Sequence, residues 1–393
     1  MAALDGIVVL DLSRALAGPF AAMTLGDLGA DVLKIEAPGM GDATRGFPPF
    51  WNGVSCYYLS TNRNKRGMTL NLDTAGGQEI LKALAARADI LIESFRTGVM
   101  ERWGLGWDDL RRINPRLIYC AISAAGREGP EKDRVGVDLL MQAYGGLMAI
   151  TGEEGRPPVR TGTSVVDLST GANAVQGILA ALYVRERTGI GQRVDVSLLG
   201  SVVTWLTYHA VGYFATGENP PRMGSRHPGV MPYGAYPTRD GFLVVAVAME
   251  SLWQRFCQAI GHPEWANDPR FARNPDRVAN RAQLDALLES ALAERTASEW
   301  SEIMDRAGVP CSPVNSLQTV LNLPQVVHQE LVVAVPRDDL PSLRMPGIAI
   351  KLSATPGTIR RPPPKLGEHT DEVLRALGYD DAAIGRLRRE GIV

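Results

Sequence analysis

The first 125 positions of the chain alternate between short apolar runs and segments with helical spacing. A short apolar run at 6–10 and strand-like segments at 31–36, 89–93 and 117–123 each have the length of a buried parallel strand. The segments with helical spacing between them lie at 19–28, 76–87 and 107–113. Strands that alternate with helices in this way predict an α/β fold, a parallel sheet with helices on both faces.

The pattern becomes helical from about Thr170, and Gly189 and Gly191 end that helix. Residues 198–214 are apolar on nearly all sides, which predicts burial in a large core or in a subunit interface. Residues 217–241 are rich in Gly, Pro and Arg, as in a linker or an active-site loop. The elements expected after that point are a hairpin at 236–247 that turns at Asp240-Gly241, helices near 251–260, 280–295 and 298–307, strand-like residues at 331–352, and two short closing helices.

Composition excludes several classes of function. The 393 residues carry 41 basic and 43 acidic side chains, so no global basic field exists to hold nucleic acid or an anionic membrane. The four cysteines and five histidines are scattered without metal-ligand spacing, and we expect no metal site. Isolated thiols, an N-terminus without a basic signal region and the lack of an 18-residue apolar run predict a cytoplasmic protein with no membrane contact.

The turn after the first strand is a candidate binding site. Residues 11–19 lack the G-x-G-x-x-G fingerprint, so they do not predict a dinucleotide. The helix that follows still offers a free N-terminus near Leu16 and Ala17, which can receive a phosphate or a thioester.

Basic residues near two strands are further candidates. Residues 62–66 form a basic pentapeptide in a predicted loop, either a solvated surface run or, ahead of Asn71, a grip for an anion. Phe95, Arg96 and Arg102 follow the third strand, at the sheet edge where α/β proteins bind ligands. An aromatic ring beside arginines suits an adenine with its phosphates.

Two further stretches have both a structural and a functional interpretation. Asp167, in the stretch 165–171, is either a helix cap or a carboxylate that stays ionised at the positive end of a helix and attacks a carbonyl. The loop with Gly224, Arg226, His227 and Tyr233 is either an ordinary linker or a substrate loop.

Together these stretches resemble, in family order from about residue 5 to 380, the class III CoA-transferase family, also called the formyl-CoA transferase or CaiB–BaiF family. The residues that carry the resemblance are 9–13 with 17–19, 29–36, 41–45, 64–66, 93–98, 114–119, Asp167 with Gly171, 188–192, 232–233, 240–241, 308–310 and 366–370. Each motif alone is weak, and their joint order over nearly the whole chain is specific.

The resemblance implies a Rossmann-like large domain built from residues 1–215 and 330–393, with a smaller α+β domain inserted at 225–325. It also implies an interlocked homodimer, in which two ring-like chains thread through each other, an exception to the rule against threaded connections.

The resemblance further implies that Asp167 is the nucleophile of a ping-pong reaction. Its carboxylate would attack an acyl-CoA thioester, and CoA would then pass through an aspartyl-CoA thioester to an acceptor carboxylic acid, for which a dicarboxylate is a candidate. CoA thioester is thus a substrate, and no tightly bound cofactor is expected. Candidate CoA contacts are Leu16, Ala17, Arg45, Asn71, Phe95, Arg96, Arg102, Val137 and Asp138, and the glycine-rich loop with Gly224, Arg226, His227 and Tyr233 is the candidate oxyanion and substrate loop.

Two alternatives to transfer stay open. The family also contains α-methylacyl-CoA racemases, which use a G-H-D sequence where this chain has Gly136-Val137-Asp138, so the imidazole is absent. A catalytically silent CoA-binding homologue is the other alternative, and Asp167 argues against it. The chain also departs from formyl-CoA transferases, which carry Gln at the position of Leu16 and Arg at that of Ala37. Formate and oxalate specificity is therefore not implied, and Arg45, Arg96 or Arg102 would have to replace the missing phosphate contact.

Overall fold

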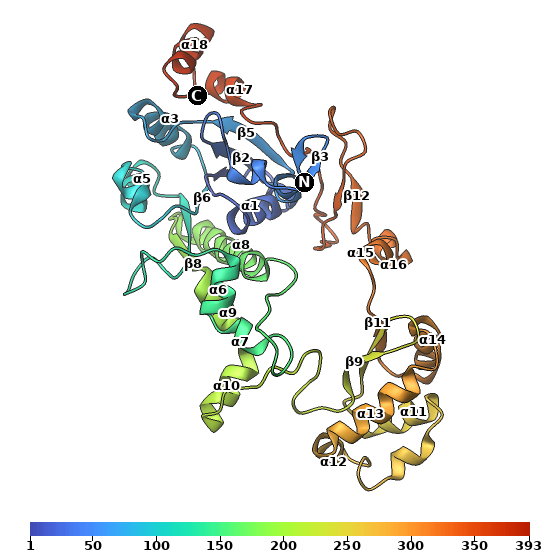
Figure 1. The fold of residues 1–393 in the computed structure, drawn as a ribbon. Coiled ribbons are helices and arrows are strands. Elements are labelled where there is room, and N and C mark those ends of the chain that lie inside the picture. Colours follow the sequence, from blue (N-terminus) through green and yellow to red (C-terminus); the bar gives the residue numbers. More distant parts are fainter. The chain divides into compact units, whose positions relative to one another are not determined.

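A computed structural model describes residues 1–393 and divides them into two compact units (Figure 1). The larger unit comprises Met1–Leu147, Arg160–Phe214 and Gln325–Val393, and the smaller comprises Met148–Val159 and Ala215–Pro324. Residues 148–159, expected in the large domain, cluster with the smaller unit. Backbone contacts explain this, because Gly224 N donates to Gly152 O over 2.8 Å and the guanidinium of Arg222 donates to the carbonyl of Glu153.

The larger unit is built on a six-stranded sheet in the order β5-β2-β1-β6-β7-β8, with every pairing parallel. Its strands are β1 Val8–Asp11, β2 Asp31–Glu36, β5 Lys65–Thr69, β6 Ile90–Glu93, β7 Ile118–Ser123 and β8 Arg193–Ser197. The four strands expected from apolar runs are confirmed. The two edge strands, β5 and β8, were missed because neither contains two adjacent apolar residues that would mark a strand buried on both faces.

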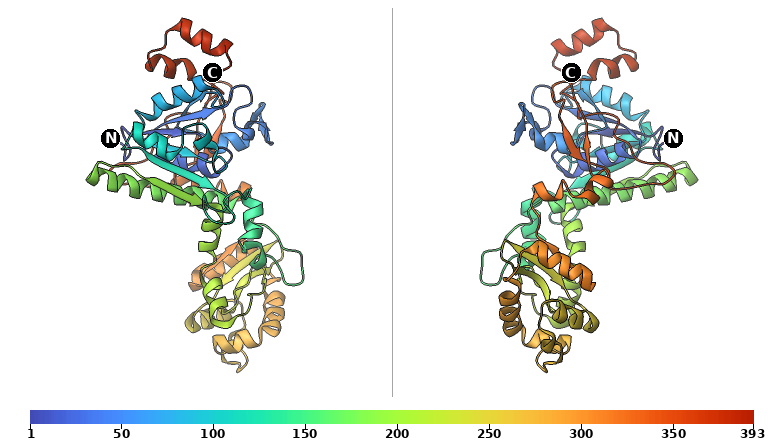
Figure 2. Two further views of the ribbon diagram at one scale, coloured as in Figure 1. Left: turned by 90° about the vertical axis from the view of Figure 1, so that its left-hand side faces the viewer. Right: turned by 90° about the vertical axis from the view of Figure 1, so that its right-hand side faces the viewer.

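Helices cover both faces of this sheet. On one face, α1 (Ala17–Asp27) and α8 (Val165–Thr188) share a core with β1, β6 and β7, together with α6 (Asp138–Tyr144) and α9 (Leu198–Trp205). Figure 2 shows α8 as one continuous long helix. The other face is covered by α3 (Ala75–Ala85), α5 (Trp107–Ile113), α17 (Thr370–Ala376) and α18 (Asp381–Arg389). The α/β fold with a parallel sheet is therefore confirmed, and the C-terminal helices return to the same core.

Shorter elements complete the larger unit and its connections. They are the 3-10 helix Ala43–Gly46, β3 Phe50–Trp51, β4 Val54–Ser55, α2 Cys56–Ser60, α4 Val99–Arg102, α7 Leu147–Ile150, α10 Thr207–Thr216, α15 Leu317–Val320, α16 Pro324–His328, β12 Val332–Ala334 and β13 Arg344–Pro346. The strand-like segment 331–352 is thus an antiparallel hairpin of β12 and β13.

Only the beginning of the apolar segment 198–214 belongs to the core of this chain, through Leu198 and Val202. It divides into α9 and α10 at Thr207, which has a φ of +40°. Large hydrophobic side chains remain exposed on it, namely Val203, Trp205, Tyr208, Val211, Tyr213 and Phe214. Of the two predicted environments, burial in the core is wrong for these residues, and a subunit interface stays a prediction.

Helix α8 is long and apolar enough to cross a membrane by these two measures alone, although the sequence analysis found no such run. Half of its most apolar stretch is buried within the chain. Ala174, Val175 and Ile178 belong to the core that α8 shares with α1 and the sheet, which is the environment of a core helix.

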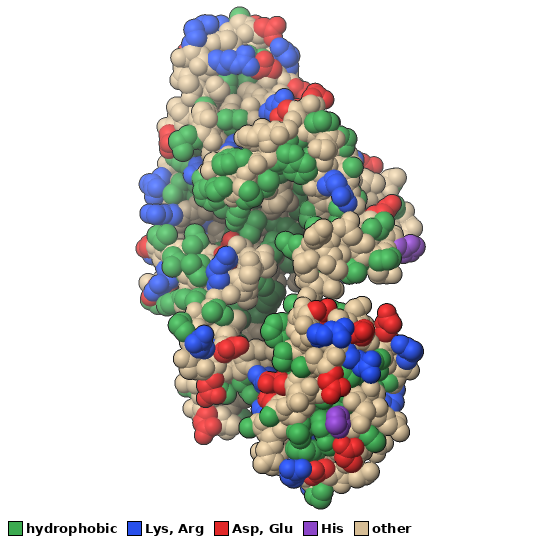
Figure 3. Space-filling view, turned by 45° about the vertical axis from the view of Figure 1, so that its right-hand side comes forward, with side chains coloured by type: hydrophobic (Ala, Val, Ile, Leu, Met, Phe, Trp, Pro, Cys, Tyr) green, Lys and Arg blue, Asp and Glu red, His purple; other side chains and the backbone are tan.

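The smaller unit has its own core. Strands β9 (Tyr233–Pro237), β10 (Phe242–Ala246) and β11 (Cys311–Pro313) form an antiparallel sheet, and the predicted hairpin closes where Thr238 N donates to Gly241 O. Its helices are α11 Glu250–Ala259, the 3-10 helix Pro263–Asn267, α12 Asn274–Ala279, α13 Arg281–Leu292 and α14 Ala297–Ala307. On the face drawn in Figure 3, acidic and basic side chains are interspersed over this unit. No field of one sign is visible there.

Candidate active site

The strand order places a ligand site between β1 and β6. The chain winds outward from β1 in both directions, and ligands of such sheets bind at the carboxyl edge where the winding reverses. The loops after these two strands touch there, since Arg14 N donates to the hydroxyl of Ser94 over 3.0 Å. A cavity of about 560 Å³ opens between them, lined by both loops, by residues 132–137 and by Asp167.

A buried network of charges holds the loop after β1. The ammonium of Lys34 donates to Ser13 O over 3.0 Å and pairs with the carboxylate of Asp42 over 3.2 Å. That carboxylate also accepts from Ala15 N, a residue in the left-handed region with a φ of +63°. Because these partners are buried, the loop enters α1 in one conformation and presents Leu16 and Ala17 to the cavity.

The basic pentapeptide 62–66 is not a solvated loop. Arg63 pairs with the carboxylate of Asp27 over 2.6 Å, and Lys65 pairs with that of Asp11 over 2.8 Å in the buried interior. Arg66 pairs with carboxylates at the sheet edge. The expectation of a solvated surface run is wrong, because these side chains are largely buried. The alternative, that they bind an anionic ligand, is not supported either, because protein carboxylates already neutralise these cations.

Asp167 lies in the first turn of α8, not ahead of it. The helix begins at Val165, and the N-cap residue Ser164 makes no side-chain cap bond. Asp138 caps the helix in its place, since its Oδ1 accepts from Val166 N at 2.8 Å and from Asp167 N at 3.3 Å. The capping interpretation of Asp167 is therefore wrong, and its side chain is free to line the cavity.

Burial, followed by the charge of Asp138, raises the pKa of Asp167 to about 7. The sequence alone predicts a carboxylate that stays ionised at the helix N-terminus. The structure corrects this, because Asp138 already occupies the first N–H groups of α8 with a negative charge. Asp167 thus changes charge near neutral pH, where a carboxyl can act as nucleophile once it has lost its proton.

Helices α1 and α8 meet closely beside Asp167. A Cβ at Gly171 would lie 2.6 Å from Ala17 O, so a larger side chain there would push the helices apart. Gly171 is one turn beyond Asp167 and shares its face of α8. The first turn of α1, where backbone N–H groups have no helical partner, therefore faces the same cavity as Asp167.

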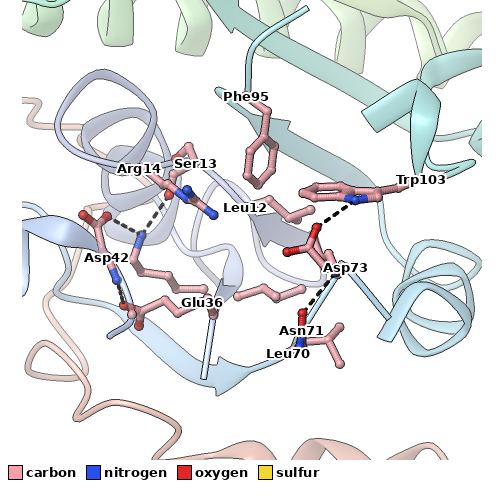
Figure 4. Close-up of a pocket in the computed structure, with 15 residues that line it drawn as sticks. Leu12, Ser13, Arg14, Glu36, Asp42, Leu70, Asn71, Asp73, Phe95 and Trp103 are labelled. Carbon is pink, nitrogen blue, oxygen red and sulfur yellow. Dashed lines mark hydrogen bonds and ion pairs between the residues drawn. The ribbon is translucent and has the colours of Figure 1, made fainter. Parts of the chain in front are cut away.

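A smaller pocket of about 50 Å³ adjoins the loop after β1 (Figure 4). Phe95 and Trp103 meet edge to face there with ring centroids 5.2 Å apart, and the guanidinium of Arg14 lies 4.9 Å from the Phe95 centroid. Trp103 Nε1 donates to Asp73, whose backbone N–H donates in turn to the side chain of Asn71. The structure thus brings Asn71 and Phe95 together, and it adds Arg14 and Trp103, which the sequence analysis missed.

Arginines and a lysine line the larger cavity without carboxylate partners. Arg96 and Arg102 lie where the sequence predicted, and Lys132 joins them from the loop after β7. Arg45 lines neither cavity. Its guanidinium pairs with Glu36 over 2.7 Å and donates to the hydroxyl of Tyr58, so it is already occupied by protein partners.

Comparison with known proteins extends this picture. The model of CoA-transferase family III matches residues 4–370. The chain belongs to this family. The human succinyl-CoA:glutarate CoA-transferase is 40% identical over 99% of this chain and 90% of its own length. The acetyl-CoA:oxalate CoA-transferase of Acetobacter aceti is 39% identical over 96% of each chain. A CaiB/BaiF family protein from Brucella suis has a similar structure, with a TM-score of 0.87, 36% identity and coverage of 96% of this chain and 99% of its own.

The sequence-based expectation of a CoA-transferase is thus confirmed at the level of the family and its activity. Val137, at the position of the racemase histidine, lines the cavity of this family III transferase and offers no titratable group. Asp138 lies outside the cavity lining and is buried against the first turn of α8.

The predicted substrate loop of the transferase belongs to the smaller unit. Arg226 pairs with Asp285 over 2.8 Å, and His227 Nδ1 accepts from Gly229 N. The rings of His227 and Tyr233 lie 5.4 Å apart between centroids, and Gly224 has a φ of +61° that favours glycine. The role of these four residues as a substrate loop stays a prediction.

Proposed function

We propose that this transferase moves CoA from an acyl-CoA to a carboxylic acid through an aspartyl-CoA thioester on Asp167. The observation that carries the proposal is the position of Asp167 in the first turn of α8, facing the cavity at the carboxyl edge of the sheet. The first turn of α1 faces the same cavity, so a nucleophile and hydrogen-bond donors converge on it.

The two adjoining pockets support a path for CoA. The adenine would lie against Phe95 and Trp103 near Asn71, since aromatic rings bind a flat base by stacking. Arg96, Arg102 and Lys132 would hold the phosphates, because each cation lacks a protein partner. The thioester end would then reach Leu16, Ala17 and Asp167.

Each half-reaction exchanges one bond for another. The Asp167 carboxylate attacks the thioester carbonyl and expels the CoA thiolate, which leaves an acyl–aspartyl anhydride. The thiolate then attacks the aspartyl carbonyl, releases the donor acid and leaves aspartyl-CoA. The acceptor carboxylate enters by the same two steps in reverse, so a new thioester forms and Asp167 is regenerated. Backbone N–H groups of the first turn of α1 would stabilise the oxyanions.

The acid that exchanges CoA is proposed to be a small carboxylic acid, with dicarboxylates included. The relatives compared above are named for glutarate and oxalate, which each have two carboxyl groups. The reaction needs no tightly bound cofactor, because CoA itself is the group that moves.

The exposed apolar helices support a homodimer, interlocked as in the family. Trp205, Tyr208, Val211 and Phe214 on α9 and α10 are exposed, and so is Tyr183 on α8. Large apolar side chains that gather on neighbouring helical turns and face solvent are typical of a protein–protein interface. Sedimentation at micromolar concentration would give the mass of two chains, and a monomer with full activity would contradict the proposal.

The test of the covalent mechanism is a trapped intermediate. The enzyme would be incubated with an acyl-CoA and no acceptor, digested, and searched by mass spectrometry for CoA on Asp167. Hydroxylamine should cleave this adduct. Transfer that proceeds at full rate with no adduct at any time would contradict the aspartyl-CoA route. A panel of acids, read by the acyl-CoA products, would identify the acceptor.

A further inference from the structure

A third cavity lies beside the first turn of α8 and is not part of the CoA path. It has a volume of about 550 Å³ and is walled by Leu16, the N-cap residue of α1, by Phe20 of α1, by Tyr57 and by Leu168 of α8. Leu16 lines both this cavity and the one that contains Asp167. The two cavities therefore meet at the same turn, one on each side of Leu16.

The part of this cavity lined by Tyr57 and Ser164 lies near Asp167. The hydroxyl of Tyr57 bonds to the side chain of Ser164, and the negative charge of Asp167 helps to raise the pKa of Tyr57, after burial. Ser164 and Leu168 bracket Asp167 along the chain and both face this cavity. A carboxyl group that reacts at Asp167 could thus project its carbon chain between Leu16, Phe20 and Tyr57.

The cavity also contains a cation without a partner. Arg160 lines it as an exposed residue, and its guanidinium makes no hydrogen bond or ion pair. The other arginine in the lining, Arg63, is already neutralised by Asp27. The residues after Arg160 are anchored, since Thr161 N donates to Gln142 Oε1 over 3.0 Å and Gln142 donates to Asp138, the cap of α8. The backbone next to Arg160 is therefore tied to the residue that caps the helix of Asp167.

We propose that Arg160 binds the distal carboxylate of a dicarboxylic acid whose other carboxyl group exchanges CoA at Asp167. This inference rests on the proposed function and adds the substrate class and the residue that selects it. A carboxylate placed among Leu16, Phe20 and Leu168 loses hydration, and a guanidinium with two parallel N–H donors compensates for that loss. A monocarboxylic acid of the same length would leave the guanidinium without its partner.

The experiment compares acceptors that differ in one carboxylate. Rates of CoA transfer would be measured with succinate and glutarate and with butyrate and valerate, for the wild type and for Arg160→Met and Arg160→Lys. We expect Arg160→Met to lower kcat/KM for the dicarboxylates by about 10- to 100-fold, as for loss of a charged hydrogen bond, mainly through KM. Activity with the monocarboxylates should stay within about threefold, inside the spread of surface substitutions. Arg160→Lys should recover part of the loss, because lysine restores the positive charge but not the two parallel N–H donors of the guanidinium.

Arg156→Met is the matched control, because Arg156 is an exposed arginine four residues away that lines none of the three cavities. Equal losses of activity for both acid classes in Arg160→Met, or no loss for either class, would overturn the role of Arg160. Neither outcome would count against the transferase mechanism at Asp167. A wild type that forms no aspartyl-CoA and transfers CoA to none of these acids would count against the proposed function itself.

Discussion

The carboxylate of Asp138 accepts a hydrogen bond from the backbone N–H of Asp167, so one acid caps the helix that presents the other. The same contact brings two negative charges together, and after burial it is the charge of Asp138 that raises the pKa of Asp167 to about 7. Asp138 therefore has two separable effects. It positions the first turn of α8, and it delays ionisation of the nucleophile.

Substitution of Asp138 separates these effects. Asp138→Asn keeps an oxygen that can accept from Val166 N and Asp167 N but removes the charge, so the pH profile of kcat/KM for acyl-CoA should move to lower pH. Asp138→Ala also removes the cap, which should lower unfolding free energy by about 1 kcal/mol and reduce kcat at every pH. If the Asn variant keeps the wild-type profile, the charge of Asp138 does not act on Asp167.

The activity of the wild type should depend on pH near neutrality. Because the pKa of Asp167 is raised to about 7, most of the free enzyme is protonated at pH 6 and ionised at pH 8. We expect kcat/KM for acyl-CoA to rise about tenfold per pH unit below pH 7 and to level off above it. A profile that is flat from pH 5 to pH 8 would show that Asp167 is ionised throughout.

The same raised pKa predicts a change in stability. Between pH 4 and pH 7 the unfolded carboxyl of Asp167 loses its proton while the folded one retains it, so the folded state becomes less stable as the pH rises. Asp167→Asn removes this effect. The variant should melt a few degrees above the wild type at pH 8, with a smaller difference at pH 5, as measured by calorimetry at both pH values.

Activity should vanish in the same variant. Asp167→Asn and Asp167→Ala lose the nucleophile, and removal of a catalytic nucleophile lowers rates by about 10⁶-fold in well-studied hydrolases. Circular dichroism and the sedimentation mass should match the wild type. Transfer of CoA at a substantial fraction of the wild-type rate by either purified variant would assign the nucleophile to another residue.

The affinity for CoA should depend on Arg102. This side chain lines the cavity without a carboxylate partner, so Arg102→Ala should weaken acyl-CoA binding by about 3- to 10-fold at low salt and less at high salt. Arg112→Ala is the control, since Arg112 lies on α5 and pairs with Asp109 outside both CoA pockets. Calorimetric titration at two salt concentrations measures the difference, and equal affinities would remove Arg102 from the site.

The pattern of apolar and polar residues along the chain was sufficient to predict much of the fold. The apolar residues of β2 and β7 and the helical spacing of α5 identify these elements within a residue or two, because strands and helices that pack on both sides of a sheet keep apolar residues at fixed spacings. The ordered motifs around Asp167 were likewise sufficient for the family, since they are read along the chain. The edge strand β5 was missed because Lys65 and Arg66 read as polar until their carboxylates are in place.

Only the tertiary structure decided which charges are available for chemistry. Arg63 and Arg160 read alike in the sequence, yet Asp27 neutralises one and the other lines a cavity without a partner. The beginning of α8 was also decided at a distance, by Asp138, which lies 29 residues before Asp167. The physical reason is that hydrophobic periodicity is a property of neighbours along the chain. The partner of a charge, and with it the pKa of Asp167, depends on residues that only folding brings together.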